Sequence, residues 1–260
     1  MDLVRFNNVA LGYKRRAVLS NLSFSVYEGE FFGIIGGSRS GKTTLLRALL
    51  GILKPMRGEI TIHVRAGEAG ALLPEGGYVN LADTPGTMRF GYVPQRDSID
   101  EAFPLTVRDV VLMGRNAELG LLRWPTAHDR DLVEKKLAQV GISELAGQRY
   151  RALSGDQKQR VLIARALAAE AHVMVLDEPA DGMSQDDRRA IAQLLAQIRA
   201  KKGTTVIYAT RRSDELSAVA QRLMLLQAGS ARVGLAKDIL GTPEETVKKQ
   251  QDKTVRLTES

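Results

Sequence analysis

The chain has 260 residues, 44% of them hydrophobic, which is enough for one large domain, or a core with a subdomain, around a buried interior. It contains no cysteine, which excludes disulfide bonds and thiolate metal sites and fits a reducing cytoplasm. The net charge is +7, from 37 Lys and Arg against 30 Asp and Glu, but the basic residues stand in small dispersed groups. Such groups are typical of a solvated surface rather than of a patch that binds nucleic acid.

The N-terminal part of the chain alternates between strand-like and helix-like patterns. Two segments rich in β-branched and apolar residues predict an antiparallel pair, with turns at Gly12 and Glu28-Gly29, and a short wholly apolar run then predicts a strand buried on both faces. A helix is expected from the glycine-rich stretch to about Leu53, where Lys54-Pro55 would end it, before a further strand. The four predicted strands are Leu3–Leu11, Val18–Val26, Phe31–Ile35 and Gly58–Val64.

The rest of the chain continues this alternation after a Gly/Pro-rich stretch, residues 66–87, which predicts a surface loop or hairpin. Strands are predicted at Phe90–Val93, Val173–Leu176, Thr204–Ala209 and, as a hairpin around Gly229-Ser230, over Arg222–Val233. Helical patterns run from Arg96 to about Ala152, most clearly over Thr106–Met113 and His128–Val140, and recur at Ser154–Ala169, Arg188–Arg199 and Asp214–Ala220.

This order of elements predicts an α/β fold with a parallel sheet. We expect a single domain over residues 1–241, with an antiparallel β subdomain at its N-terminus and an inserted helical subdomain at about 96–158. Residues 242–260 are polar and are expected to form a partly ordered tail. The first residues lack the order of a signal peptide, and no apolar run approaches the ~20 residues that span a bilayer, so we expect a cytoplasmic location.

One glycine-rich loop carries the clearest chemical signal. Four of its residues have the spacing G-x-x-x-x-G-K-[ST], and the full loop is Gly36, Gly37, Ser38, Arg39, Ser40, Gly41, Lys42, Thr43 and Thr44. Successive backbone N–H groups of such a loop, with the start of the following helix, form a concave site for phosphates. Lys42 would reach the β- and γ-phosphates and the Thr43 hydroxyl would ligate Mg²⁺, so the loop predicts binding of a nucleoside triphosphate.

Further motifs resemble those of ATP-binding cassette (ABC) ATPases over nearly the whole chain. They are Tyr13 ahead of the loop, Gln95 at the end of GYVPQ, the signature stretch Leu153–Gln157 before a helix, and Asp177-Glu178 at the end of VMVLDE. The resemblance implies a P-loop NTPase (RecA-like) core, ATP and Mg²⁺ as ligands, and ATP hydrolysis.

The resemblance also gives each motif a role with a physical reason. Asp177 ends a buried strand, where a carboxylate is costly unless it meets a cation such as Mg²⁺, and Glu178 follows it in the place of a general base. Gln95 would touch metal and water, or simply cap its strand, and Tyr13 would stack on adenine, or simply end its strand. Ser154, Gly155, Asp156 and Gln157 start a helix and would close over the γ-phosphate held by a second cassette.

Four positions near the expected γ-phosphate depart from the family pattern. Arg39 and Asp156 stand where glycine is usual, Ser184 where aspartate is usual, and Arg211 in the place of the switch histidine. A carboxylate at Asp156 opposes an incoming polyanion, by about 4 kcal/mol for unit charges 4 Å apart at an effective dielectric of 20. Either hydrolysis is weakened and the chain is a slow or regulatory cassette, or Arg39 neutralises Asp156 of a partner and Arg211 donates to the γ-phosphate. The side chains could also simply face solvent.

The resemblance implies the ATP-binding subunit of a transporter, acting with transmembrane permease subunits, with or without a solute-binding protein that acts through them. The second cassette could be an identical or a different chain, and the permease contact is expected beside Gln95 and residues 97–115. The stretch 101–115 is similar to cassettes that take up metal ions and their chelates. The alternative is a soluble ABC protein acting on nucleic acid or ribosomes; such proteins usually carry two cassettes or a long coiled coil, which this sequence lacks.

Overall fold

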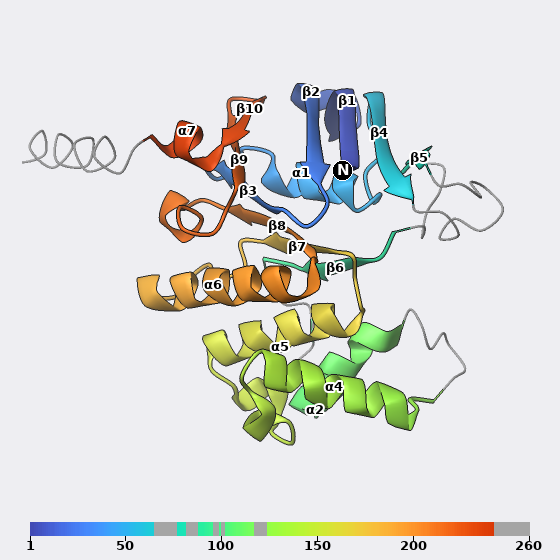
Figure 1. Cartoon of the computed structure of the whole chain (residues 1–260), viewed down its shortest axis with the longest axis vertical. Coiled ribbons are helices and arrows are strands. Elements are labelled where there is room, and N and C mark those ends of the chain that lie inside the picture. Colours follow the sequence, from blue (N-terminus) through green and yellow to red (C-terminus); the bar gives the residue numbers. More distant parts are fainter. Residues whose placement is uncertain (65–76, 82–87, 96–98, 100–101, 117–123, 242–260) are drawn as a thin grey trace, which may run out of the picture.

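A four-stranded antiparallel sheet covers one side of the molecule (Figure 1). The computed structural model describes residues 1–64, 77–81, 88–95, 99, 102–116 and 124–241. In this sheet the strand order is β2-β1-β4-β5, formed by β1 (Asp2–Tyr13), β2 (Arg16–Tyr27), β4 (Arg57–Val64) and β5 (Gly77–Asn80). The predicted N-terminal antiparallel pair is therefore confirmed.

A second sheet of six strands, in the order β10-β9-β3-β8-β7-β6, forms the centre of the molecule. Its five neighbouring strands from β9 to β6 pair in parallel, and β10 pairs with β9 antiparallel as a hairpin. The strands are β3 (Phe31–Gly36), β6 (Phe90–Val93), β7 (Val173–Asp177), β8 (Thr205–Thr210), β9 (Arg222–Gln227) and β10 (Ser230–Leu235). The predicted parallel α/β sheet is confirmed.

Helices cover both faces of this central sheet (Figure 1). Helix α1 (Lys42–Leu49) lies on the side of the antiparallel sheet, and α6 (Gln185–Lys202) and α5 (Gly155–Ala168) lie on the other. Helices α2 (Val107–Leu112) and α4 (Ala127–Gln139) pack beyond α5, with the 3₁₀ turns Met113–Arg115, Ser143–Leu145 and Tyr150–Ala152. The short helix α7 (Ala236–Leu240) follows β10, and the predicted boundary near residue 158 falls inside α5.

Two hydrophobic cores share the central sheet. Because successive side chains of a strand point to opposite faces, Phe31 joins the core beneath α5 and α6 while Phe32 and Ile34 join the core beneath the antiparallel sheet and α1. All three side chains are at most 2% exposed. Burial on both faces explains why this strand reads as a continuous apolar run, and it fixes the position of the loop that follows.

Three sequence expectations need correction. The turn between β1 and β2 lies at Lys14-Arg15 rather than at Gly12, which stays in the strand and pairs with Ala17. The position needs glycine because a Cβ there would lie 2.1 Å from the Arg16 carbonyl oxygen. Helix α1 ends at Leu49 instead of Leu53, because Gly51 adopts a φ of +72° and its N–H returns to the Ala48 carbonyl.

The third correction concerns the predicted helix Asp214–Ala220. The structure has a 3₁₀ turn, Ser213–Glu215, followed by single turns that do not continue into a helix, although the N–H groups of Ser217 and Ala220 each donate to a carbonyl four residues earlier. The Glu215 side chain is buried and accepts a hydrogen bond from the Tyr208 hydroxyl at 2.8 Å, which holds the chain against the core instead of letting it wind as an amphipathic helix.

Parts of two further predictions lie outside the described residues. Of the expected loop or hairpin at 66–87, the structure describes β5, which pairs antiparallel with β4. The predicted polar tail, 242–260, also falls outside. Among the helices that are described, none has the length and apolar character that crossing a membrane requires.

Candidate functional site

The candidate site lies where four neighbouring parallel strands end at the same edge of the central sheet. In the order β3-β8-β7-β6, the pairs Ile35–Thr210, Asp177–Ala209 and Val93–Leu176 bring these carboxyl ends level. The glycine-rich loop follows β3, Arg211 follows β8, Glu178 follows β7 and Gln95 follows β6. Residues far apart in sequence therefore meet at this edge. The carboxyl ends of parallel strands are also where folds of this kind bind their ligands.

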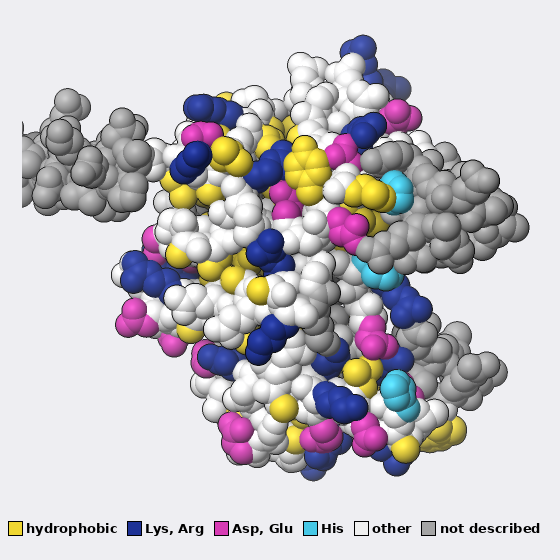
Figure 2. Space-filling model, in the orientation of Figure 1, with side chains coloured by type: hydrophobic (Ala, Val, Ile, Leu, Met, Phe, Trp, Pro, Cys, Tyr) yellow, Lys and Arg dark blue, Asp and Glu magenta, His cyan; other side chains and the backbone are white. Residues whose placement is uncertain are grey.

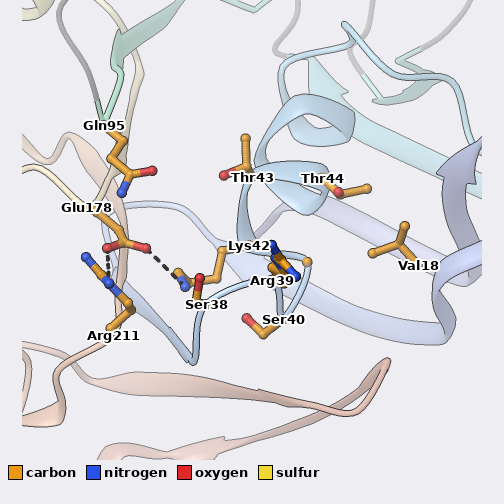
Figure 3. A pocket seen from close by; sticks show the side chains of 11 residues that line it. Val18, Ser38, Arg39, Ser40, Lys42, Thr43, Thr44, Gln95, Glu178 and Arg211 are labelled. Carbon is orange, nitrogen blue, oxygen red and sulfur yellow. Dashed lines mark hydrogen bonds and ion pairs between the residues drawn. The ribbon is translucent and has the colours of Figure 1, made fainter.

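These residues enclose a cavity of about 210 Å³ (Figure 3). Its lining is Val18, Ser38, Arg39, Ser40, Gly41, Lys42, Thr43, Thr44, Gln95, Glu178 and Arg211. The loop is tightly folded: a Cβ at Gly36 would lie 2.3 Å from the Ser40 hydroxyl oxygen, and Gly41 has a φ of +101° immediately before α1. The Lys42 ammonium, almost fully buried, donates to the carbonyl oxygens of Gly36 at 2.7 Å and Gly37 at 3.0 Å.

Asp177 and Thr43 form the part of the site suited to a divalent cation. The Thr43 hydroxyl donates to Asp177 Oδ2 at 2.8 Å, and Asp177 Oδ1 is buried without a hydrogen-bond partner in the described structure. Burial raises the pKa of Asp177, although the bond from Thr43 acts in the opposite direction. A hard cation such as Mg²⁺ prefers oxygen ligands of this kind, and it would give the unpartnered carboxylate oxygen the compensation that burial otherwise denies it. The residues therefore fit the expected metal.

Glu178 lies among cations. Its carboxylate is 3.2 Å from the Lys42 ammonium through Oε1, and its Oε2 accepts a hydrogen bond from Arg211 Nε at 2.5 Å (Figure 3). A second guanidinium nitrogen of Arg211 donates to Asp181 Oδ1 at 2.6 Å. The hydrogen bond from Arg211 to Glu178 and the charges of the two carboxylates raise the pKa of Arg211. Glu178 itself adopts a left-handed φ of +47°, a conformation that concentrates at functional positions.

Asp181 is the site residue that the sequence did not single out. It accepts hydrogen bonds from Arg211 and, at 3.4 Å, from the Gln95 amide, so it joins the residues after β8 and β6. Asp181 stands three residues after Glu178. The only signal in the sequence is its charge, which is opposite to that of Arg211, the residue in the place of the switch histidine. Val18, also in the cavity lining, gave no signal beyond its place in a predicted strand.

The signature residues lie at the start of α5, and they are not among the described residues that line the cavity of the glycine-rich loop. Ser154 is the N-cap of α5, as predicted: its hydroxyl accepts from the Gln157 N–H at 3.4 Å, and Gln157 in turn accepts from the Ser154 N–H at 3.0 Å. Asp156 forms an ion pair with Arg160 at 3.5 Å, one turn along the same helix. This partner within the chain already offsets part of the charge of Asp156.

Two other positions are explained by local structure. Ser184 is the N-cap of α6 and accepts a hydrogen bond from the Asp187 N–H at 3.2 Å, a role in which serine equals the usual aspartate. Tyr13 ends β1, is 42% exposed, and accepts a hydrogen bond at its hydroxyl from an Arg47 guanidinium nitrogen at 3.3 Å; it is not among the residues that line the described cavity. Stacking of Tyr13 on adenine stays a prediction.

Comparison with known proteins gives a consistent family. The ABC transporter family model matches residues 19–181. The chain is 38% identical over 204 residues, 78% of this chain and 75% of the relative, to the manganese transport system ATP-binding protein MntB of Bacillus subtilis. It is 32% identical to the zinc import ATP-binding protein ZnuC of Roseobacter denitrificans, over 94% of this chain and 83% of that one.

The fold leads to the same family. The inward-facing structure of a metal-chelate type ABC transporter superposes with a TM-score of 0.79 at 27% identity, covering 95% of this chain and 88% of that chain. Together with the converging phosphate loop, Asp177 and Glu178, these matches carry the identification. The chain therefore belongs to the ABC transporter family, as one of its ATP-binding subunits with ATPase activity.

Proposed function

We propose that the chain powers the uptake of a transition-metal ion of the manganese or zinc class, or of a chelate of such a metal, through a separate transmembrane permease. The observation that carries this proposal is the likeness to manganese and zinc transport ATP-binding proteins at 31–38% identity over most of the chain. The metal is the cargo here, and it would pass through the permease rather than bind this chain.

In this proposal residues of the cavity, together with Asp177, act on ATP and its metal. Lys42 and the loop N–H groups, with Arg39 beside them, hold the β- and γ-phosphates, and Thr43 and Asp177 hold Mg²⁺, with Gln95 nearby. Bound there, Mg²⁺ would neutralise charge that develops on the phosphates. Glu178 orients the attacking water and accepts its proton.

We also propose that a second cassette completes the ATP-binding site. Ser154–Gln157 of one chain would close over the γ-phosphate held by the other, so that ATP binding joins the two and hydrolysis separates them. The permease would contact the region of Gln95 and α2, of which residues 99, 102–116 and the strand end at Gln95 are described. Such a subunit lies on the cytoplasmic face of the membrane.

Reconstitution in vesicles tests the proposal. The chain is purified with its permease, and ATP-dependent accumulation of Mn²⁺ and Zn²⁺ is measured beside phosphate release, with Glu178→Gln as the matched control. We expect accumulation that stops in the variant, because the isosteric amide cannot accept the proton, with a loss of at least about 10²-fold in phosphate release. ATP hydrolysis by the complex without accumulation of either metal or of a chelate would contradict the substrate class.

One observation favours a second candidate, a slow regulatory cassette. The ion pair between Arg211 and Glu178 engages the carboxylate that should act as base. Steady-state phosphate release from the complex, compared with that of Glu178→Gln, separates the two functions: a wild-type rate no higher than that of the variant would favour the regulatory one.

A further inference from the structure

Both carboxylate oxygens of Glu178 face a cation. Oε1 lies 3.2 Å from the Lys42 ammonium, and Oε2 accepts from Arg211 at 2.5 Å. A general base needs a carboxylate oxygen that can accept a proton from water within hydrogen-bond reach. Each oxygen of Glu178 keeps a second lone pair, but a cation on it lowers its basicity, so release of one pair would make Glu178 a stronger base. Lys42 is buried and already bonded to the two loop carbonyls, whereas the Arg211 side chain is 42% exposed, so the pair with Arg211 is the one that has room to open toward solvent.

A third charge fixes Arg211 in place. A long, half-exposed arginine loses rotamer freedom when it adopts one geometry, and a single ion pair in water compensates for little of that loss. Arg211 makes two: its Nε donates to Glu178 and its terminal nitrogen donates to Asp181 at 2.6 Å. This forked geometry suits the rigid guanidinium plane. Asp181 is itself held by the Gln95 amide at 3.4 Å.

We infer that Asp181 is a positioning residue, which holds Arg211 against the Glu178 carboxylate and so sets how readily the terminal phosphate of ATP can draw Arg211 away. The inference rests on the proposed function, in which the cavity binds ATP and Glu178 is the base. Asp181 and the γ-phosphate are rival anions for one guanidinium. A nucleoside diphosphate lacks the terminal phosphate and does not enter that competition.

Loss of the Asp181 charge should change the binding of a nucleoside triphosphate but not that of a diphosphate. Removing the charge of Asp181 strengthens binding of a triphosphate, because Arg211 then leaves one carboxylate instead of two, while binding of a diphosphate stays as it is. A general loss of negative charge near the site would favour both nucleotides alike. The ratio of the two affinities therefore distinguishes positioning of Arg211 from a bulk electrostatic effect.

The test measures dissociation constants of the full chain for Mg²⁺ with the non-hydrolysable triphosphate AMP-PNP and for Mg²⁺ with ADP, by titration calorimetry at one ionic strength. The variant is Asp181→Asn. Asp186→Asn is the matched control, because it removes the same charge from an exposed position in the first turn of α6. Asp181→Glu restores a carboxylate on a longer arm. Asp181 is 40% exposed, so none of these changes disturbs the core.

In Asp181→Asn we expect the ratio of the ADP to the AMP-PNP dissociation constant to rise about two- to fivefold, the range that an exposed ion pair gives. The control should keep the wild-type ratio, and Asp181→Glu should return to it. An unchanged ratio in Asp181→Asn, or an equal rise in the control, would overturn the inference. Failure of the wild-type chain to bind either nucleotide would instead contradict the proposed function.

Discussion

Arg39 combines an unusual residue with an unusual backbone. It lines the phosphate-loop cavity with a φ of +63°, in the left-handed region that favours glycine, the residue this family usually has there. A residue with a Cβ has a cost of roughly 1–2 kcal/mol in that region. The backbone at Arg39 is therefore strained. We expect the arginine side chain to have a function in the cavity that offsets this loss of stability.

We expect Arg39→Gly to raise the free energy of unfolding by about 0.5–1 kcal/mol, the relief of left-handed strain less the larger conformational entropy of glycine in the unfolded chain. Urea denaturation measures this. Arg39→Ala is the control, because it removes the guanidinium but keeps the Cβ, and it should give no gain. Equal stabilisation by both variants would show that the charge, and not the backbone, is what destabilises the loop.

Residue chemistry at the cavity was only partly predictable. The motifs identify four residues of the site from the sequence, because each motif requires a residue type at a fixed spacing: Lys42, Thr43, Asp177 and Glu178. Asp181 does not, because its role depends on an arginine 30 residues away that the sheet brings beside it. Pairing across such a distance is set by strand order, which local pattern does not specify.

Helix α6 is fixed to the loop after β8 by a buried ion pair. Arg188, on the first turns of α6, has its Nε 3.1 Å from Glu215 Oε1, as an ion pair without the alignment of a hydrogen bond, and donates to the Met183 carbonyl oxygen at 2.6 Å. Tyr208 of β8 donates to the other oxygen of Glu215. Arg188 and Glu215 are 7% and 4% exposed. The pair thus connects the segment after Glu178 with the segment that carries Arg211.

We expect Arg188→Met to lower the free energy of unfolding by about 3 kcal/mol at pH 7, because it leaves the Glu215 charge buried without its partner. Burial already raises the pKa of Glu215 above its ordinary 4.5, so the charged form is penalised in the folded chain. The penalty is complete above the raised pKa and disappears below about 4.5, where Glu215 is protonated both folded and unfolded. The loss should therefore shrink as the pH falls.

Denaturation midpoints at several pH values check this expectation. The double variant Arg188→Met with Glu215→Gln removes both charges and should recover most of the stability at pH 7, since a neutral pair leaves no buried charge unmatched. A loss in Arg188→Met that does not change with pH would mean that packing of the arginine stem, rather than the Glu215 charge, carries the effect.

Elements were predictable where burial and pattern agree. Strand β3 reads correctly because both of its faces are buried, and Ser154 reads correctly as an N-cap because Gln157 completes the capping box. The segment after Arg211 misleads, because its apolar spacing suits a helix while Glu215 is held by Tyr208 and Arg188. Tertiary contacts of one buried carboxylate override local preference there.

At the scale of the whole molecule, the site depends on the order of the strands. The sequence predicts parallel strands and a phosphate loop, but not that β8 and β7 lie between β3 and β6. That order places the loop, Arg211, Glu178 and Gln95 side by side. On the face seen in Figure 2, basic side chains are interspersed with acidic ones over the described surface, so the excess of positive charge forms no single basic patch there.

Because the cavity walls come from four different strand ends, a ligand that fills it binds the folded chain and not the unfolded one. Mg²⁺ with AMP-PNP at 100 times its dissociation constant should then stabilise the fold by about 2.7 kcal/mol, seen as a rise in the melting temperature that grows with ligand concentration. Lys42→Ala should abolish the rise, because Lys42 is a buried cation in the lining of this cavity, where we propose that the phosphates bind. Thr204→Ser, on the opposite edge of the sheet before β8, should keep it. A rise that persists in Lys42→Ala would mean that the nucleotide binds elsewhere. The cavity formed by the four strand ends would then not be the nucleotide site.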